Sequence, residues 1–191
     1  DGSGNTAICS FQIMLVDTQK PEFDADITMP NDTTVNCDAV PSNCVYHGPL
    51  VCTPLTKNDV HDNCTASGNL VVNYNEVSTQ NPNPALCSHY TYDLTRTWTI
   101  TDCAGNALVH VQKIHVQDTT APVALCKNAT IQLDKTGKVI LDPQLVNNGS
   151  YDNCAAFPYL TFSVAPNQFT CANLGPNQVT LFVTDPCGNV G

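Results

Sequence analysis

Residues 102–122, DCAGNALVHVQKIHVQDTTAP, contain the pattern that decides the fold, and residues 1–21, DGSGNTAICSFQIMLVDTQKP, repeat it. Both segments begin with D-x-x-G-N, continue with alternating apolar residues, and end with D-T-x-x-P at the same spacing. A third D-x-x-G-N, DPCGN, occupies residues 185–189. A pattern that recurs at a fixed spacing predicts an array of small tandem domains.

The segments next to these motifs predict β-strands. In residues 91–101, TYDLTRTWTIT, threonines line one face and apolar residues line the other, namely Tyr92, Leu94, Trp98 and Ile100. This alternation is typical of a half-buried strand. No stretch sustains the i, i+3, i+4 spacing of an amphipathic helix, so we predict an all-β fold without long helices.

Composition narrows the cellular setting and the partners. The chain has 191 residues, 11 cysteines and a formal net charge of −10. So many cysteines predict disulfides and an oxidising compartment, so we expect an extracellular or cell-surface protein. The negative charge argues against nucleic acid or an anionic membrane surface as a partner. No apolar run is long enough to predict a membrane span.

The aspartates of the repeated motifs are candidate calcium ligands. Four of them fall near the predicted domain ends, where hard oxygen ligands could converge: Asp17, Asp102, Asp118 and Asp185. Turn formation is the commoner role of aspartate in such motifs, and calcium binding is the alternative. No other cofactor is expected.

The sequence contains no recognisable catalytic constellation. The five histidines are scattered, and the five-residue spacing of His110 and His115 puts them on opposite faces of a strand. No G-x-S-x-G, H-E-x-x-H or glycine-rich phosphate loop occurs. We therefore expect that the protein is not an enzyme.

Short modification signals are also present. Four N-x-S/T sequons and two D-T-T stretches give the candidate glycosylation sites Asn31, Asn63, Asn128, Asn148, Thr33 and Thr119. A β-protein rich in threonine and asparagine also meets such short signals by chance, so both interpretations stay open.

Several motifs recur in order and resemble the hyalin-repeat family, in the tandem form found in large surface proteins of gliding and filamentous bacteria. They are DNC at 62–64 and 152–154, RTWTITDCAGN at 96–106, VTDPCGN at 183–189, VNCDAVP at 35–41, and the D-T-x-x-P junctions at 16–21 and 116–122. The resemblance covers nearly the whole chain. It implies immunoglobulin-like β-sandwiches joined end to end, and adhesion or structural spacing rather than catalysis.

The resemblance predicts two immunoglobulin-like sandwiches, at residues 17–118 and 119–191. The second lacks its last strand, and the first is preceded by an extra strand at residues 1–16, which belongs to a neighbouring repeat. We expect this strand of one copy to complete the second sandwich of another copy. Its assembly residues are Ile8, Cys9, Phe11, Ile13 and Leu15. The alternative is a simple tandem array with free thiols.

The cysteines are expected to be mostly structural. The family pattern implies the disulfides Cys37–Cys87 and Cys64–Cys103, and a Cys9–Cys126 bond between copies. Cys44 and Cys52 flank the insertion at 43–52 and are expected to close it. Cys154 could bond to Cys171 or to Cys187, and the sequence leaves that choice open.

These observations together predict an extracellular structural repeat protein. It would be a subunit or segment of a surface filament whose copies join head-to-tail by strand donation and disulfides. The alternative is an adhesin module that binds a glycan or a protein through loops such as 44–52.

Overall fold

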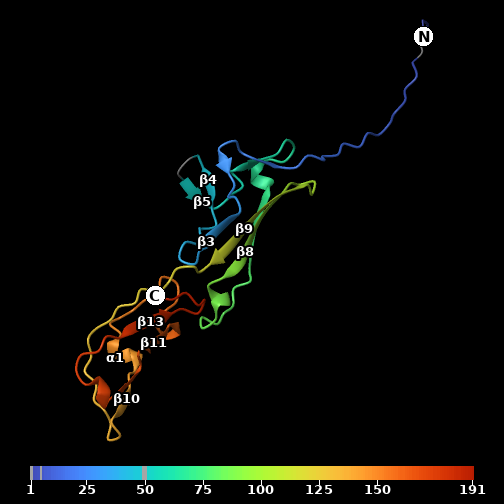
Figure 1. Ribbon diagram of the computed structural model, residues 1–191. Helices are drawn as coiled ribbons and strands as arrows, with labels where there is room; N and C mark the ends of the chain where they lie inside the picture. The colour runs from blue at the N-terminus through green and yellow to red at the C-terminus, as the bar shows by residue number, and fades with distance from the viewer. Residues whose placement is uncertain (1, 5, 49–50) are drawn as a thin grey trace. The chain divides into compact units, whose positions relative to one another are not determined.

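The computed structural model describes residues 2–4, 6–48 and 51–191 (Figure 1). Asp1 and Asn5 of the first D-x-x-G-N motif, and residues 49–50 of the predicted binding loop, lie outside the described residues. The chain divides into two compact units: unit 1 contains Asp1–Met29, Cys44–Tyr74 and Thr97–His110, and unit 2 contains Pro30–Asn43, Asn75–Arg96 and Val111–Gly191. Because these segments interleave along the chain, the predicted domains 17–118 and 119–191 stay a prediction.

The described residues form short strands with very little helix, which confirms the predicted all-β class. We call residues 17–117 the first repeat and residues 118–191 the second repeat. The strands are β1 (Glu22–Phe23), β2 (Ile27–Thr28), β3 (Thr33–Asn36), β4 (Val45–His47), β5 (Val51–Thr53), β6 (Val60–His61), β7 (Val71–Ser78), β8 (Tyr92–Thr101), β9 (Ala107–Gln117), β10 (Lys138–Ile140), β11 (Thr161–Ala165), β12 (Gln168–Thr170) and β13 (Thr180–Thr184). That they pack as immunoglobulin-like sandwiches remains a prediction.

The helical elements are single turns. They are the helix α1 (Pro143–Val146) and the 3-10 helices η1 (Ser67–Asn69), η2 (Cys87–His89), η3 (Phe157–Tyr159) and η4 (Cys171–Asn173). None of these is long or apolar enough to cross a membrane. η1 and η3 each follow a DNC motif at the same distance, so the two repeats share their local structure.

The largest sheet has the strand order β3-β9-β8-β7, and a three-stranded sheet has the order β2-β4-β5. The remaining strands form the pairs β1-β6, β10-β12 and β11-β13. β8 shows the predicted alternation, because Leu94, Trp98 and Ile100 are all buried. The fourth buried position on this face is Arg96, which a search for apolar residues alone does not find.

Arg96 is a buried charge whose nitrogens are paired. Its Nε donates to Glu76 Oε2 at 2.7 Å, and its terminal nitrogens donate to the carbonyls of Ser42 and Pro41 at 3.0 and 2.9 Å. Burial of a guanidinium is costly unless it is paired and hydrogen-bonded, and these three bonds meet that requirement. Arg96 therefore ties β8 to the segment that follows β3.

β9 runs parallel to β3, with Thr33 opposite Ile114 and Val35 opposite Val116. The same register extends before β3, because Gln112 Nε2 donates to the carbonyl of Asn31 at 2.9 Å. Gln112, Ile114 and Val116 are all buried. Alternate residues of β9 therefore point inward, and the parallel partner strand fixes their positions.

Unit 1 has one cluster of buried hydrophobic residues, and unit 2 has two. In unit 1, the core includes Trp98, as predicted, and the Trp98 ring lies 5.3 Å from that of Tyr74. In unit 2, Leu94, Ile114 and Val116 form one cluster, and a second one comprises Tyr90, Leu141, Ala155, Leu160, Val164, Phe169, Leu181 and Val183.

Three disulfides are present among the described residues. Cys44 bonds to Cys52 and closes the β4–β5 hairpin, as expected from the insertion. The other two lie in unit 2 and pair Cys37 with Cys154 and Cys87 with Cys187, with Cα–Cα distances of 5.9 and 4.4 Å. The expected Cys37–Cys87 bond is therefore wrong, and Cys154 takes neither of its two expected partners.

The parallel pairing of β3 with β9 gives the physical reason. The Cys37 amide donates to the carbonyl of Gln117 at 2.9 Å, so Cys37 lies where β9 passes into the second repeat. There it meets the DNC motif of that repeat at Cys154. The expected Cys64–Cys103 bond is also absent, and the free cysteines are Cys9, Cys64, Cys103, Cys126 and Cys171.

Candidate functional site

Residues 6–16 form no strand and are fully exposed (dark blue in Figure 1). The segment is nevertheless rich in large apolar side chains, with Ile8 94 % exposed, Phe11 83 % and Leu15 89 %. Contiguous exposed apolar surface usually marks an interaction site. The expected assembly residues are therefore accessible to a partner.

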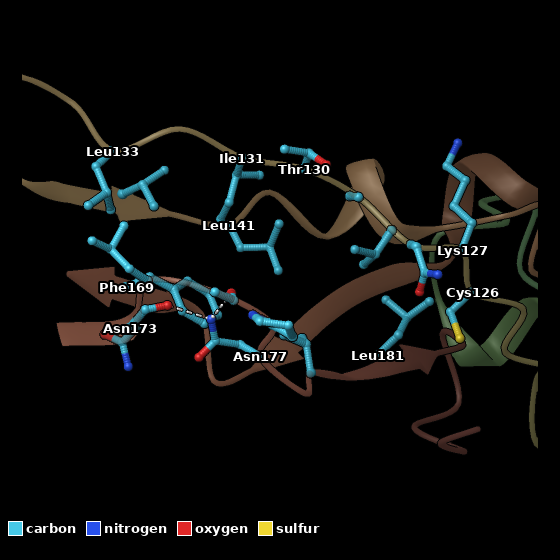
Figure 2. Close-up of a pocket in the computed structure, with 18 of the residues that line it drawn as sticks. Cys126, Lys127, Thr130, Ile131, Leu133, Leu141, Phe169, Asn173, Asn177 and Leu181 are labelled. Atoms are coloured by element: carbon cyan, nitrogen blue, oxygen red, sulfur yellow. Dashed lines mark hydrogen bonds between the residues drawn. The ribbon is translucent and has the colours of Figure 1, made fainter. Parts of the chain in front are cut away.

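Unit 2 contains a groove of about 780 Å³. One wall is formed by residues 126–133 and the other by residues 173–181, with Leu141 and Phe169 between them (Figure 2). Cys126 lines one end of it, and its thiol is free and exposed. Protein cores leave few voids larger than a water molecule, so a hollow of this size within a β-domain is a candidate site for an additional segment or ligand.

The groove lies between the equivalents of two strands that flank β9 in the first repeat. The sequons at Asn31 and Asn128 align β3 with residues 130–133, and the D-x-x-G-N motifs align β8 with β13. β8 has ten residues, but β13 has only five. Residues 175–179, which correspond to the first half of β8, form no strand. Among the described residues, no strand occupies the position in the second repeat that β9 has in the first.

A second feature is a pair of aspartate clusters, one in each unit. Cluster 1 consists of Asp17, Asp62 and Asp102, and cluster 2 consists of Asp118, Asp152 and Asp185. In each cluster the three carboxylates contribute oxygen atoms that lie within 4.8 Å of one another. The four aspartates suggested by the sequence thus fall into two separate groups.

Each cluster also contains an aspartate that sequence reasoning did not include. Asp62 and Asp152 are the first residues of the two DNC motifs, so the signal that could have found them is the recurrence of that motif. Asp62 Oδ2 accepts hydrogen bonds from the amides of Cys64 and Thr65 at 2.9 and 2.7 Å. Asp152 Oδ2 makes the same two bonds, both at 2.8 Å.

The other members are held in matching ways in the two clusters. Asp102 Oδ1 accepts from the amide of Asn106 at 2.8 Å, and Asp185 Oδ1 accepts from that of Asn189 at 3.0 Å. The amide side chains of these asparagines donate to the second carboxylate oxygen, at 2.7 and 2.8 Å. The repeated sequence therefore produces the same constellation twice.

Four buried carboxylate oxygens in these clusters have no hydrogen-bond partner. They are Oδ2 of Asp17, Oδ1 of Asp62, Oδ2 of Asp118 and Oδ1 of Asp152, the same atoms in both repeats. Burial raises the pKa of the Asp118 carboxyl to about 6, against a hydrogen bond from Thr120 and with the help of the charge on Asp185. The free thiol of Cys64 lies beside cluster 1, and desolvation together with the nearby carboxylates raises its pKa.

The remaining predicted sites are on the surface. All six glycosylation candidates are exposed: Asn31, Asn63, Asn128, Asn148, Thr33 and Thr119. In the loop at 44–52, Tyr46 and Val51 are exposed on the β4–β5 hairpin.

No protein-family model matches the chain, and no curated protein matches it.

Proposed function

We propose that the protein is an extracellular structural repeat protein whose copies join head-to-tail. Residues 8–16 of one copy enter the groove of unit 2 of the next copy as an added strand. Two observations together carry the proposal. The exposed segment matches β9 in sequence, and a groove lies at the position in the second repeat that β9 occupies in the first. Strand addition supplies main-chain hydrogen bonds for affinity and side-chain pockets for register.

The register can be worked out from the first repeat. Thr33 is opposite Ile114 in the β3–β9 pair, and the repeats align these two residues with Thr130 and Ile13. Counting back along parallel strands brings Cys9 opposite Cys126. Neighbouring strands are about 4.8 Å apart, and disulfide-bonded Cα atoms are about 4.4–6.8 Å apart, so the two thiols can bond.

The same alignment decides which side chains would fill the groove. Phe11, Ile13 and Leu15 take the places of Gln112, Ile114 and Val116, which are the buried residues of β9. Full burial of such a side chain stabilises by about 1.5–3 kcal/mol. Met14 takes the place of His115, which is exposed, so its contribution is small.

The disulfide between Cys87 and Cys187 suggests a second covalent link between copies. Cys87 begins η2, and Cys171 begins η4 at nearly the same distance before its D-x-x-G-N motif. Cys103 lies in the first repeat's D-x-x-G-N motif, as Cys187 does in that of the second. We therefore assign Cys171 of one copy to Cys103 of the next, which leaves Cys64 as the free thiol.

Such contacts use different surfaces at the two ends, so they can repeat from copy to copy and propagate a filament. The three disulfides are compatible with an extracellular location. The adhesin alternative would use the exposed side chains of loop 44–52, such as Tyr46 and Val51.

The test is assembly of the oxidised 191-residue chain, followed by light scattering and by peptide mapping without reductant. We expect polymers that contain Cys9–Cys126 and Cys103–Cys171 peptides. Deletion of residues 1–16 should leave monomers with unchanged circular dichroism.

Matched variants separate strand donation from simple thiol oxidation. Ile13→Asp should abolish assembly, whereas Met14→Asp, which changes the neighbouring outward residue, should largely preserve it. Cys64→Ser should assemble normally. Equal assembly of the deletion variant and the full chain, or a monomeric full chain under oxidising conditions, would rule the mechanism out.

A further inference from the structure

We propose that the two aspartate clusters are calcium-binding sites, one in each repeat. Cluster 1 would use Asp17, Asp62 and Asp102, and cluster 2 would use Asp118, Asp152 and Asp185. The proposal does not depend on strand donation, because each cluster is complete within its own unit.

The geometry suits a hard cation. Calcium takes carboxylate oxygens at about 2.3–2.6 Å, which brings its ligand atoms within about 5 Å of one another. The candidate oxygens of each cluster already lie within 4.8 Å. Three carboxylates supply most of the charge that a calcium site needs, and backbone carbonyls and water commonly complete it.

The burial of cluster 2 points to a missing positive partner. Asp118 is only 5 % exposed, and its Oδ2 has no hydrogen-bond donor. Asp185 is also 5 % exposed, and Asp152 contributes a buried Oδ1 that is likewise unpaired. Buried polar atoms are nearly always satisfied, and buried charges are paired or coordinate metals. No lysine or arginine forms an ion pair with these carboxylates in the described part of the chain.

The pattern of used and unused oxygens identifies the ligand atoms. Asp152 Oδ2 is taken by two backbone amides, and this orients its free Oδ1. Asp118 Oδ1 accepts from Thr120 at 3.3 Å and leaves Oδ2 free. Asp62 and Asp17 make the equivalent arrangement in cluster 1. The same two oxygens are free in both repeats, which a chance grouping of turn aspartates does not explain.

The chemistry favours calcium over a softer metal. Cys64 lies beside cluster 1, but its counterpart Cys154 is bonded to Cys37 and is not a thiolate ligand. The donors common to both clusters are therefore three carboxylates. Thiolates and imidazoles select zinc or copper, whereas carboxylates select calcium, magnesium or manganese.

The experiment is calorimetric titration of the chelator-treated chain with calcium chloride, with magnesium as a comparison, together with thermal unfolding. We expect two binding events per chain and a rise in Tm of several degrees at saturating calcium. Asp118→Asn and Asp17→Asn should each remove one event. The matched control is Asp26→Asn, which removes one exposed charge outside both clusters.

The sign of the effect without calcium distinguishes a cation site from a structural role. Without the cation, Asp118→Asn removes a buried like-charge repulsion, so its Tm should equal or exceed that of the parent chain. With calcium, the parent chain should gain more than the variant. Asp152→Asn gives an independent check on cluster 2. Absence of calcium binding at millimolar concentration, or binding that both cluster variants retain, overturns the proposal.

Discussion

β9 and residues 6–16 have closely similar sequence patterns but different structures. Both follow D-x-x-G-N, both alternate apolar residues, and both lead into D-T-x-x-P. β9 is an eleven-residue strand between β3 and β8, with Ile114 and Val116 buried. Residues 6–16 have no strand neighbour and expose Ile13 and Leu15. The pattern therefore specifies which side chains share a face, but a strand forms only where neighbouring strands receive it.

The residues that line the groove also show that a strand forms only where a neighbouring strand pairs with it. β8 is a ten-residue strand next to β9, whereas β13 begins only at Thr180. Val190 and Gly191 pair with Thr184 and Val183, so the hairpin of the second repeat starts in the same way as that of the first. Residues 175–179 have no such neighbour and form no regular secondary structure.

The largest contrast is expected from the same substitution at matched positions. Ile114→Asp places an unpaired charge in the core, so it should cost more than about 4 kcal/mol or prevent folding. Ile13→Asp changes a residue that is 72 % exposed and should leave the unfolding free energy of the monomer within about 0.5 kcal/mol. Chemical denaturation of both variants measures the difference. A similar loss at both positions would show that residues 6–16 are packed in the monomer.

Arg96 and Val179 form the next pair, because the alignment of the D-x-x-G-N motifs places them at matched positions of the two repeats. Arg96→Ala leaves Glu76 and two backbone carbonyls without their donor, and should cost about 3 kcal/mol. Val179 lines the groove. Val179→Ala should therefore lower the unfolding free energy of the monomer by less than Arg96→Ala does. Urea unfolding monitored by Trp98 fluorescence reports the two values, and a reversed order would contradict this comparison.

The disulfides should differ with the length of chain they enclose. Loop-closure entropy predicts about 4.7 kcal/mol for a loop of 100 residues and roughly 2.5 kcal/mol for one of eight residues. The double variant Cys87→Ser/Cys187→Ser should therefore lose about 2 kcal/mol more than Cys44→Ser/Cys52→Ser. Thermal unfolding of both variants under oxidising conditions tests this. Equal losses would mean that native-state packing rather than loop length sets their contribution.

The smallest expected effect concerns the inward residue at which the two segments differ most. Gln112 is buried, donates to the carbonyl of Asn31, and has an unpaired Oε1, whereas its counterpart in the exposed segment is Phe11. Gln112→Leu removes one hydrogen bond and one unsatisfied oxygen, so the unfolding free energy should change by only about 1 kcal/mol. Denaturant titration gives the value, and a loss above about 3 kcal/mol would mean that Gln112 organises a larger network.

Local pattern was sufficient for β8 and for the short disulfide. It also predicted a strand at residues 1–16, and this prediction is wrong for residues 6–16, which have no neighbouring strand. The alternation in residues 92–101 predicted the buried face of β8, because period-two spacing maps directly onto the two sides of a strand. Cys44 and Cys52 are close in sequence, so their pairing needs only a hairpin. The burial of Arg96 could not be predicted in this way, because it depends on Glu76 and on carbonyls more than fifty residues away in the sequence.

Contacts between residues far apart in the sequence could not be predicted without the structure. Cys37 pairs with Cys154 because β3 lies parallel to β9, and a parallel neighbour far away in sequence leaves no trace in local spacing. The sequence analysis found four of the six aspartates in the two clusters. Asp17 and Asp102 belong to the longer motifs, whereas Asp62 enters through the short DNC motif, whose carboxylate meets the other two only in the folded chain.

The Cys37–Cys154 and Cys87–Cys187 bonds also determine how the chain would respond to a pulling force. They bridge sequence separations of 117 and 100 residues, so tension passes through sulfur rather than through the residues between. A chain of 117 residues spans roughly 400 Å when fully stretched, and the first bond withholds that length from extension. While this bond is intact that length stays out of reach of extension, and reduction releases it.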